Sequence, residues 1–332
     1  MFIFSNNIFP HILCLNILTS GLVSYYNQIN GLNRKSHKAD LINHFTAKNP
    51  LVKEDKIMLR VFVDSGSSIK QSEKKQYNVE IIPLKILLGD KEYSDGIDLS
   101  MDFFYSKLID DGLFPKTSLP SLDETEKKIM QYVEQGDDVI ILPISSGISG
   151  TYNTFRIMFE DQPNVRVIDT KTAVGGVRIL VEEVNKYRDK GLDYIEKKLN
   201  ELIPRIRVAA IPETLEYLHR GGRLSKTAFV AGSLAQVKPL ITFEDGFVKV
   251  LTKAIGLKRA MITLAKLLET ECDTSYHIIP SYTYSNKNLV DLIKMVDHKF
   301  LPSMVHQDNL DPAIACHWGP GAFGFIFVRK EN

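Results

Sequence analysis

The apolar run Val139–Ile144 and the loop after it constrain the fold more than any other part of the sequence. The run is almost continuously apolar, as is typical of a strand that is buried on both faces of a parallel sheet. A loop rich in serine and glycine follows at residues 145–150, and Tyr152, Phe155 and Phe159 then fall on one stripe of a helix. The segment therefore predicts a unit of strand, loop and helix.

The same alternation of strands and helices extends from Met58 to about residue 200. Strands are predicted at Leu59–Val63, Val79–Leu88 and Val165–Ile168, and helices at Asp102–Ile109, Ser121–Gln135 and Val177–Arg188. Ser121 and Glu124 have the spacing of a capping box, in which each side chain binds the other residue's backbone amide. We therefore expect an α/β domain at residues 57–204, with a mostly parallel sheet that helices cover on both faces.

The order of the elements changes after residue 204. Strands are predicted at Ile206–Ile211, Val237–Ile241, Phe247–Leu251, Tyr276–Ile279 and Phe323–Val328, and helices at Glu213–Arg220, Lys258–Thr270 and Asn286–Lys299. The residues Glu244-Asp245-Gly246 are a hairpin signal, so antiparallel pairing is expected here. Residues 205–330 are therefore predicted to form a C-terminal α+β domain.

Residues 1–56 do not share these patterns, because they mix apolar and polar side chains without helical or strand periodicity. A signal peptide is disfavoured, since no Lys or Arg precedes the apolar stretch and Pro10, His11 and Asn16 interrupt it. A membrane span would need about 20 consecutive apolar residues. We expect an extension outside both domains that is either disordered or the result of a start codon assigned too far upstream of Met58.

The charge balance and the cysteines exclude several classes of protein. With 41 Lys and Arg against 40 Asp and Glu, the net charge is +1, so nucleic acid is not an expected partner. Cys14, Cys272 and Cys316 lie far apart, without the spacing of a disulfide framework or a zinc site. We therefore expect a cytoplasmic protein with no stable membrane insertion, no metal and no cofactor.

The loop Ser145–Gly150 is the strongest candidate for a binding site. It places Ser146 and Ser149 between a buried strand and the start of a helix, where free backbone amides carry a partial positive charge. A carboxylate or phosphate could be held there without Lys or Arg, or the residues could merely turn and cap the chain. The loop lacks the motif of a P-loop or a dinucleotide site and the glycine spacing of a hydrolase nucleophile.

Other segments carry further candidate polar groups. Thr117 and Ser118 precede a predicted helix and are free to face a ligand. His317 is predicted in a tight turn before the last strand, where it is either structural or completes a carboxylate site as a hydrogen-bond donor or, when protonated, as a cation. In His219–Ser225 a glycine caps the preceding helix, and Arg223 either suits the negative helix end or contacts a phosphate or a protein.

Taken in chain order, these segments resemble those of the DegV family. The shared segments are Val63-Asp64-Ser65, residues 116–121, residues 145–152, residues 221–225, Lys238-Pro239 and residues 317–322. The resemblance covers about Met58 to Arg329, and the serine loop and the Gly-Gly-Arg segment together are more specific than either alone. It implies a two-domain fatty-acid-binding protein with an apolar ligand tunnel between the domains.

The resemblance also implies roles for individual residues. Thr117 and Ser149 would hold the carboxylate of a long-chain, palmitate-like or oleate-like fatty acid. The neighbouring candidates for this site are Ser118, Ser146 and His317. Arg223 would contact a partner, the ATP-dependent subunit of a bacterial fatty acid kinase, which is similar to dihydroxyacetone kinase and phosphorylates the bound acid. The chain itself would then be a non-catalytic protein of lipid metabolism.

Two departures from the family pattern bear on the partner and on the acyl preference. Leu119 stands where glutamine is frequent, and Ile255-Gly256 replace a basic residue and a small hydroxyl residue. Other functions also remain open. The chain could be a lipid transporter, a regulatory module with Arg223 in its interface, or an α/β enzyme, a hydrolase or nucleotide-dependent transferase, that uses the Ser146–Ser149 loop.

Overall fold

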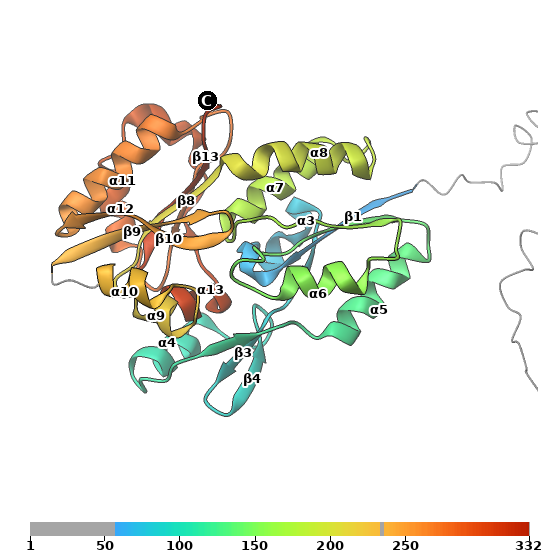
Figure 1. Ribbon diagram of the computed structural model, residues 1–332, viewed down its shortest axis with the longest axis horizontal. Helices are drawn as coiled ribbons and strands as arrows, with labels where there is room; N and C mark the ends of the chain where they lie inside the picture. Colours follow the sequence, from blue (N-terminus) through green and yellow to red (C-terminus); the bar gives the residue numbers. More distant parts are fainter. Residues whose placement is uncertain (1–56, 233–235, 332) are drawn as a thin grey trace, which may run out of the picture. The chain divides into compact units, whose positions relative to one another are not determined.

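Three sheets and the helices around them make up the part of the chain that the computed structural model describes, residues 57–232 and 236–331 (Figure 1). The chain from Ile57 onward forms one compact unit. The expectations for residues 1–56, including Cys14, lie outside the described residues.

A four-stranded parallel sheet forms the centre of the N-terminal half, with the strand order β2-β1-β6-β7. Its strands are β1 (Leu59–Asp64), β2 (Glu80–Ile82), β6 (Asp138–Leu142) and β7 (Val165–Val167). One face packs on α5 (Leu122–Val133) and α6 (Thr151–Met158), and the other on α7 (Gly175–Lys186) and its neighbour α8 (Leu192–Leu202). The prediction of a parallel sheet with helices on both faces is confirmed.

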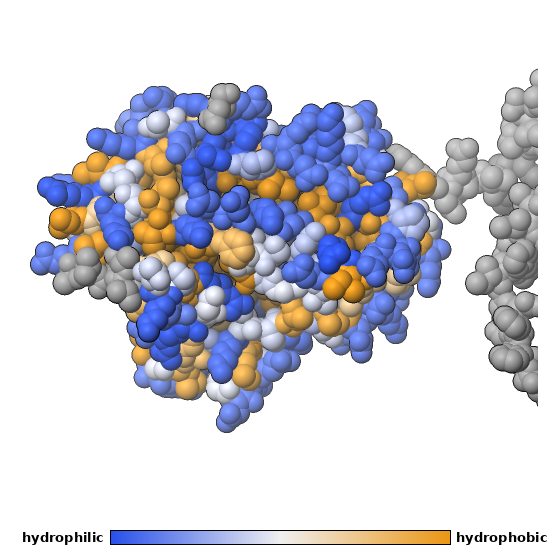
Figure 2. Space-filling view, viewed as in Figure 1, coloured by the Kyte–Doolittle hydropathy of each residue, from blue (hydrophilic) through white to orange (hydrophobic). Residues whose placement is uncertain are grey.

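The apolar runs of these strands reflect burial on both faces. Phe62 and Ile141 belong to the hydrophobic cluster under α5 and α6, whereas Val61 and Ile140 belong to the cluster under α7. Successive side chains of a strand point to opposite faces, so an alternating pattern would leave one face polar. The helix α8, in contrast to these strands, is buried on one side only, and most of its surface in Figure 2 is hydrophilic.

The segment Val79–Leu88, predicted as one strand, forms two strands in different sheets. The first is β2, and the second, β3 (Lys85–Leu88), belongs to a small antiparallel sheet with the order β4-β3-β5. Its other strands are β4 (Lys91–Ser94) and β5 (Lys116–Ser118). Pro83 lies at the break, where it has no amide to donate, and the amide of Leu84 donates to the Ser65 hydroxyl at 3.1 Å.

The C-terminal half contains a six-stranded sheet with the order β10-β9-β8-β13-β11-β12, antiparallel except for the pair β11 and β12. The strands are β8 (Ile206–Ile211), β9 (Val237–Glu244), β10 (Phe247–Ile255), β11 (Ile279–Tyr282), β12 (Asp308–Asn309) and β13 (Phe323–Val328). Asp245 and Gly246 form the predicted hairpin turn with φ angles of 50° and 84°. The bounds of the strand predicted at Tyr276–Ile279 are wrong, since β11 begins at Ile279, the last residue of the predicted strand.

The remaining helices are short, with one exception. They are α3 (Lys74–Tyr77), α4 (Met101–Ile109), α9 (Glu216–Arg220), α10 (Lys226–Gly232), α11 (Leu257–Glu271), α12 (Lys287–Ile293), α13 (Pro312–Trp318) and the 3-10 helices η1 (Ser65–Ser67), η2 (Gln71–Glu73), η3 (Ile203–Arg205) and η4 (His298–Ser303). None of the described helices is both long and apolar enough to span a membrane.

Two predicted helix features are wrong. The capping box at Ser121 is absent, because the Ser121 side chain makes no cap hydrogen bond and the Thr125 hydroxyl donates to the Ser121 carbonyl instead, at 2.7 Å. The helix predicted at Asn286–Lys299 ends at Ile293. Asp297 then starts the separate helix η4 by accepting the Lys299 amide at 3.0 Å.

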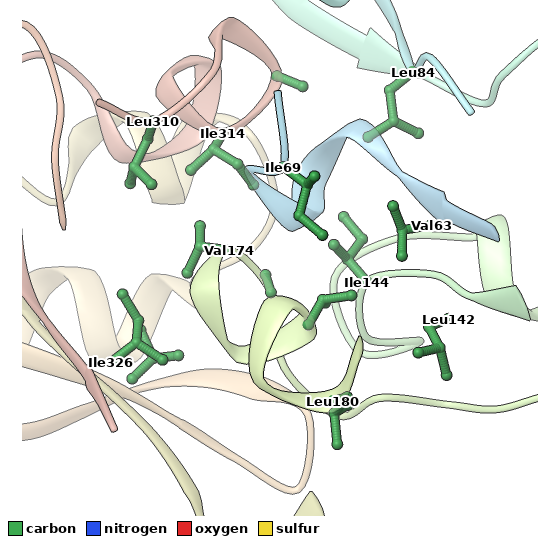
Figure 3. Close-up of a cluster of buried hydrophobic side chains, with 14 of the residues drawn as sticks. Val63, Ile69, Leu84, Leu142, Ile144, Val174, Leu180, Leu310, Ile314 and Ile326 are labelled. Atoms are coloured by element: carbon green, nitrogen blue, oxygen red, sulfur yellow. The ribbon is translucent and has the colours of Figure 1, made fainter. Parts of the chain in front are cut away.

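The hydrophobic core continues through both halves of the described chain. Figure 3 shows Val63 and Leu142 of the parallel sheet in the same cluster as Val174, Ile314 and Ile326. The sheets themselves divide at the predicted boundary, since the strands of the parallel sheet precede residue 204 and those of the six-stranded sheet follow it. The division into domains at 204 and 205 stays a prediction.

Candidate functional site

A cavity of about 230 Å³ lies between the loops after the parallel sheet and the elements of the C-terminal half. Most of the side chains that line it are apolar, among them Leu84, Ile144, Ile148, Phe243, Ile314 and Trp318. Its polar side chains are Thr117, Ser118, Ser149, Arg223 and His317. Four of the five residues predicted to bind the ligand therefore meet at one cavity, together with the residue predicted to contact a partner.

A hydrogen bond between Thr117 and His317 joins two distant parts of the chain. Thr117 lies on β5, paired with Ile86 of β3, and its hydroxyl is 2.7 Å from Nε2 of His317, which lies 200 residues further along. The prediction that His317 lies in a tight turn is wrong. His317 belongs to the end of the helix α13, and the chain leaves the helix at Gly319. The helix thereby delivers an imidazole to the cavity wall.

The environment of His317 keeps its imidazole neutral. Burial, and then the charge of Arg223, lower the pKa of His317 to about 3. Its Nδ1 atom is buried without a hydrogen-bond partner among the described residues. When Nε2 carries the proton it donates to Thr117, and the Thr117 hydroxyl is then free to donate to an anion. At neutral pH His317 can therefore take part as a hydrogen-bonding group rather than as a cation.

The Gly-Gly-Arg segment packs directly against this imidazole. A Cβ atom on Gly221 would lie 2.3 Å from Nδ1 of His317 and 2.9 Å from the Tyr217 carbonyl oxygen, so only glycine fits. Gly222 follows with a φ of 77°, and the Arg223 amide returns to the Leu218 carbonyl at 2.9 Å, which ends α9 as predicted for a glycine cap.

Arg223 faces the cavity rather than the open surface. It is half-buried, and its Nε donates to the Ile148 carbonyl at 2.9 Å, so the C-terminal half holds the serine loop through this side chain. A guanidinium at this position is a cation for a bound carboxylate. The sequence signal for it was the Gly-Gly-Arg turn, but the sequence did not indicate that the cavity would include a cation.

The serine loop uses most of its own donors. The amide of Gly147 donates to the Ser145 hydroxyl, and the amides of Ile148 and Ser149 donate to the Ser145 carbonyl, each at 3.1 Å. The Ser149 hydroxyl accepts the Thr151 amide at 3.3 Å and lies 2.8 Å from the Thr151 hydroxyl. The amides of residues 147–149 are therefore not free to bind an anion, and Ser149 contributes one hydroxyl that is already bonded. The anion site at the start of α6 stays a prediction.

Ser146 does not line the cavity. Its hydroxyl makes a short hydrogen bond to the Asp169 carboxylate, and its amide donates to the other carboxylate oxygen at 3.0 Å. Although burial raises the pKa of Asp169, hydrogen bonds from Lys171 and Ser146 bring it below its usual value. An ionised carboxylate that is also paired with Lys171 at 2.8 Å makes no basic partner for a nucleophilic serine.

Glycine in the serine loop has a packing reason. A Cβ atom on Gly147 would lie 2.4 Å from the Gly246 carbonyl oxygen, at the tip of the hairpin between β9 and β10. The Ser145 hydroxyl donates to the same carbonyl at 2.8 Å. The hairpin tip therefore closes on the loop, and the second cross-strand pair from the turn, Phe243 and Val248, forms part of the cavity wall.

Asp64, in the first segment of the family resemblance, supports the loops without facing the cavity. Its carboxylate accepts the amides of Gly66 at 3.1 Å and Ile144 at 2.9 Å, which joins the ends of β1 and β6. Burial raises the pKa of Asp64 to about 7, against the lowering by these two amides.

A second cavity, of about 520 Å³, contains none of the predicted site residues. Lys70, Asp95, Asp98 and Asp311 are among the residues that line it. Its walls are more charged than those of the first cavity. No group of three metal-ligating side chains is present among the residues described here, so neither cavity contains a recognisable metal site.

Comparisons with known proteins agree with this arrangement. A family model for uncharacterised proteins of the DegV family matches residues 58–330. The chain is 34% identical over 278 residues to a DegV domain-containing protein of Caldanaerobacter subterraneus subsp. tengcongensis, with 82% of this chain and 99% of that protein covered.

Solved structures share the fold. The crystal structure of a fatty acid binding DegV family protein from Streptococcus agalactiae is similar with a TM-score of 0.74 and 25% identity, covering 83% of this chain and all of the other. A stearic acid-binding protein from Eubacterium ventriosum is similar with a TM-score of 0.70 and 27% identity, covering 82% of this chain and 99% of the other. The predicted fold class is confirmed.

Proposed function

The chain belongs to the DegV family, and from this premise we propose that it binds one long-chain fatty acid in the cavity beside Thr117 and His317. The observation that carries the proposal is the hydrogen bond between these two side chains, which places a polar pair on the wall of a mostly apolar cavity. The carboxylate would accept from the Thr117 hydroxyl and from Arg223. The alkyl chain would lie along the apolar side chains.

The chemistry of the walls suits this division of labour. Each buried methylene contributes about 0.8 kcal/mol, so a long chain derives most of its affinity from apolar contact, while the polar pair orients the head group. A cavity of about 230 Å³ is smaller than most ligand sites, which run from about 300 to 1,000 Å³. Loading a long chain therefore requires the apolar walls to separate.

We further propose that the bound acid is presented to an ATP-dependent kinase subunit, which phosphorylates the carboxylate. Ser118 is exposed and lines the cavity, so the head group would lie near the surface where a second protein can reach it. Arg223 would contact either the kinase subunit or the carboxylate of the bound acid. The chain would bind lipid in the cytoplasm without catalysing a reaction, and it could also transport the acid. The Thr117 hydroxyl and the His317 imidazole would position the carboxylate and would not act as nucleophiles.

Native mass spectrometry of the full chain, purified without detergent, tests the binding proposal. We expect an extra mass that is released on denaturation and matches a long-chain acid. The Thr117→Val variant should lose most of this mass, whereas Ser146→Ala, whose hydroxyl bonds to Asp169, should retain it. Wild-type protein that is free of lipid and takes up no hexadecanoic acid would contradict the proposal.

The kinase step has a separate test. Incubation of the loaded chain with ATP and a fatty acid kinase subunit should yield an acyl phosphate that hydroxylamine traps. Arg223→Glu should reduce the yield even when loading is complete. Equal yields from wild-type and variant protein would remove Arg223 from the partner contact. Transfer of phosphate by this chain alone would favour the alternative of a nucleotide-dependent transferase.

A further inference from the structure

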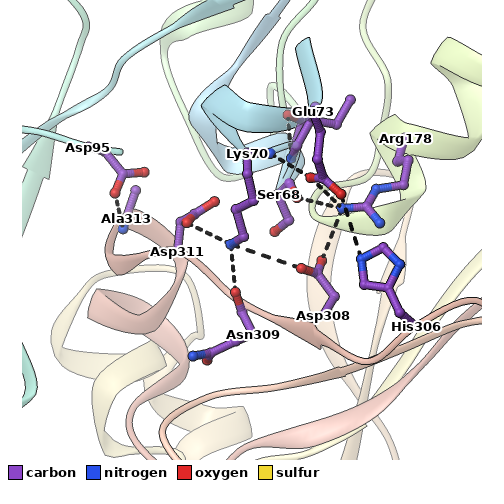
Figure 4. Close-up of polar contacts among 12 residues, drawn as sticks. Ser68, Lys70, Glu73, Asp95, Arg178, His306, Asp308, Asn309, Asp311 and Ala313 are labelled. Atoms are coloured by element: carbon purple, nitrogen blue, oxygen red, sulfur yellow. Dashed lines mark hydrogen bonds and ion pairs between the residues drawn. The ribbon is translucent and has the colours of Figure 1, made fainter. Parts of the chain in front are cut away.

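A charged cluster at the start of α13 joins the two halves of the described chain (Figure 4). Lys70, which follows η1 in the N-terminal half, donates to the Asp311 carboxylate at 2.7 Å and to the Asn309 carbonyl at 2.6 Å. Asp308 lies 3.9 Å from the same ammonium and 3.7 Å from the buried Arg178. One lysine therefore holds the strand β12 and the residue that precedes α13.

A second residue of the N-terminal half holds the first turn of the helix. Asp95, which is fully buried, accepts the Ala313 amide at 3.3 Å. The Asp311 carbonyl accepts the amides of Ile314 and Ala315 at 3.0 Å each, so Asp311 is both the ion-pair partner of Lys70 and the first residue of the helical hydrogen-bond pattern. The position of α13 thus depends on side chains that are remote in sequence.

The other end of the same helix carries the imidazole of the proposed carboxylate site. His317 lies about 9 Å from Asp311 along the axis, at a rise of about 1.5 Å per residue. Ala313, Ile314 and Trp318 of α13 also line the cavity. Backbone hydrogen bonds connect the two ends of α13, so we expect a displacement at Asp311 to reach the bond between Thr117 and His317.

Stability alone is a poor reason for such a cluster. Taking charges out of water costs much of what their pairing returns, and apolar replacements of similar size are often neutral or stabilising. Burial raises the pKa of Asp311, and the charge of Lys70 opposes this effect. We therefore expect this network to set the position of α13 between the two halves rather than to raise the free energy of unfolding.

We propose that Lys70, Asp95 and Asp311 are positioning residues that place α13, and with it His317, at hydrogen-bonding distance from Thr117. The proposal rests on the carboxylate site inferred above and deepens it. None of the three lines the apolar cavity, so each acts through the helix rather than on the ligand. Breaking the Lys70 contact is therefore expected to weaken head-group binding without changing any group that touches the acid.

The test combines Lys70→Met, the conservative Lys70→Arg and the control Lys74→Met. Lys74 is a matched control because its ion pair to Glu80 has the same 2.7 Å length and similar exposure, 29% against 33% for Lys70, but lies within the N-terminal half. Two quantities are measured on delipidated full-length protein, the affinity for hexadecanoic acid and the NMR signals of the His317 ring. Circular dichroism establishes that each variant is folded.

We expect Lys70→Met to weaken binding about tenfold and to shift the His317 signals, with Lys70→Arg restoring both and Lys74→Met changing neither. In a His317→Gln background, Lys70→Met should cause no further loss, because residues that act through one group are not additive. Unchanged affinity, or losses that add in the double variant, would overturn the proposal. If Lys70→Met does not fold, Asp311→Asn replaces it, with the same expected results.

The two levels of the argument fail separately. If wild-type protein binds no hexadecanoic acid, the proposed function fails and the NMR signals decide the positioning role: shifted signals in Lys70→Met that Lys70→Arg restores support it, and unmoved signals overturn it. If wild-type protein binds the acid and the Lys70 variants bind equally well, the positioning role fails and the proposed function stands.

Discussion

The two polar walls of the cavity are built in opposite ways. The serine loop is one continuous stretch, and its amides and hydroxyls mostly bond to Ser145, Thr151 and Asp169. The facing wall joins Thr117 of β5 to His317 of α13, and the Thr117 hydroxyl, which accepts from Nε2 of His317, still has its own proton to donate. A loop that satisfies itself is a structural support, whereas a pair assembled by the fold keeps hydrogen-bonding capacity for a ligand. We therefore expect binding to depend more on the assembled wall.

The largest effect should come from Gly221→Ala, which disturbs the assembled wall from behind. The added Cβ overlaps the imidazole of His317 and the Tyr217 carbonyl, and overpacking of this kind costs about 1–3 kcal/mol. Urea denaturation should show this loss, and acid binding should fall with it. Gly150→Ala is the control, since its Cβ would have its nearest neighbour, Leu119, at an ordinary 3.6 Å. Equal stability of the two variants would contradict the packing argument.

Thr117→Val should have the next largest effect, and chiefly on binding. Valine keeps the shape but leaves Nε2 of His317 unpaired, at a cost of about 1–3 kcal/mol, and removes the donor to the carboxylate. Titration with hexadecanoic acid should show affinity reduced about tenfold or more. Thr154→Val, which removes a hydroxyl bond to Gly150 on α6, should leave the affinity unchanged. If both variants bind hexadecanoic acid with the same affinity, the hydroxyl of Thr117 is not the main contact of the carboxylate.

The pH dependence of stability tests the burial of His317 behind the assembled wall. Because the pKa of His317 is lowered to about 3 in the folded protein, from an ordinary value near 6.5, the unfolded state takes up a proton first as the pH falls. The contribution of His317 is complete above pH 6.5 and is lost between about pH 6.5 and 3. Urea midpoints for wild type and His317→Gln should therefore converge on acidification. Parallel curves through this window would show that His317 does not titrate as expected.

The smallest effect should come from Ser149→Ala in the serine loop. The variant loses the bond to the Thr151 amide at the start of α6, worth about 0.5–1.5 kcal/mol, and one hydroxyl near the carboxylate. Its affinity for hexadecanoic acid should fall less than that of Thr117→Val. A greater loss than for Thr117→Val, measured in the same titration, would reverse the comparison and make the serine loop the main anchor.

The fold was predictable wherever local pattern and burial agree. The run Val139–Ile144 is buried on both faces, and its apolar character alone indicated a parallel sheet. Pattern failed where one local hydrogen bond formed in place of another, since the Thr125 hydroxyl donates to the Ser121 carbonyl and the predicted capping box is absent. It also failed at Val79–Leu88, where the two halves of one apolar stretch joined different sheets.

By itself the sequence determined the alternation of strands and helices, the hairpin at Asp245-Gly246 and the segments that identify the family, because each depends on neighbouring residues. The tertiary structure alone decided which hydroxyls face the cavity. The Ser146 hydroxyl bonds to Asp169, the Arg223 side chain lines the cavity, and Thr117 bonds to His317, which lies 200 residues further along the chain. The direction of a side chain depends on the packing of elements that are remote in the chain, and a linear pattern does not contain that information.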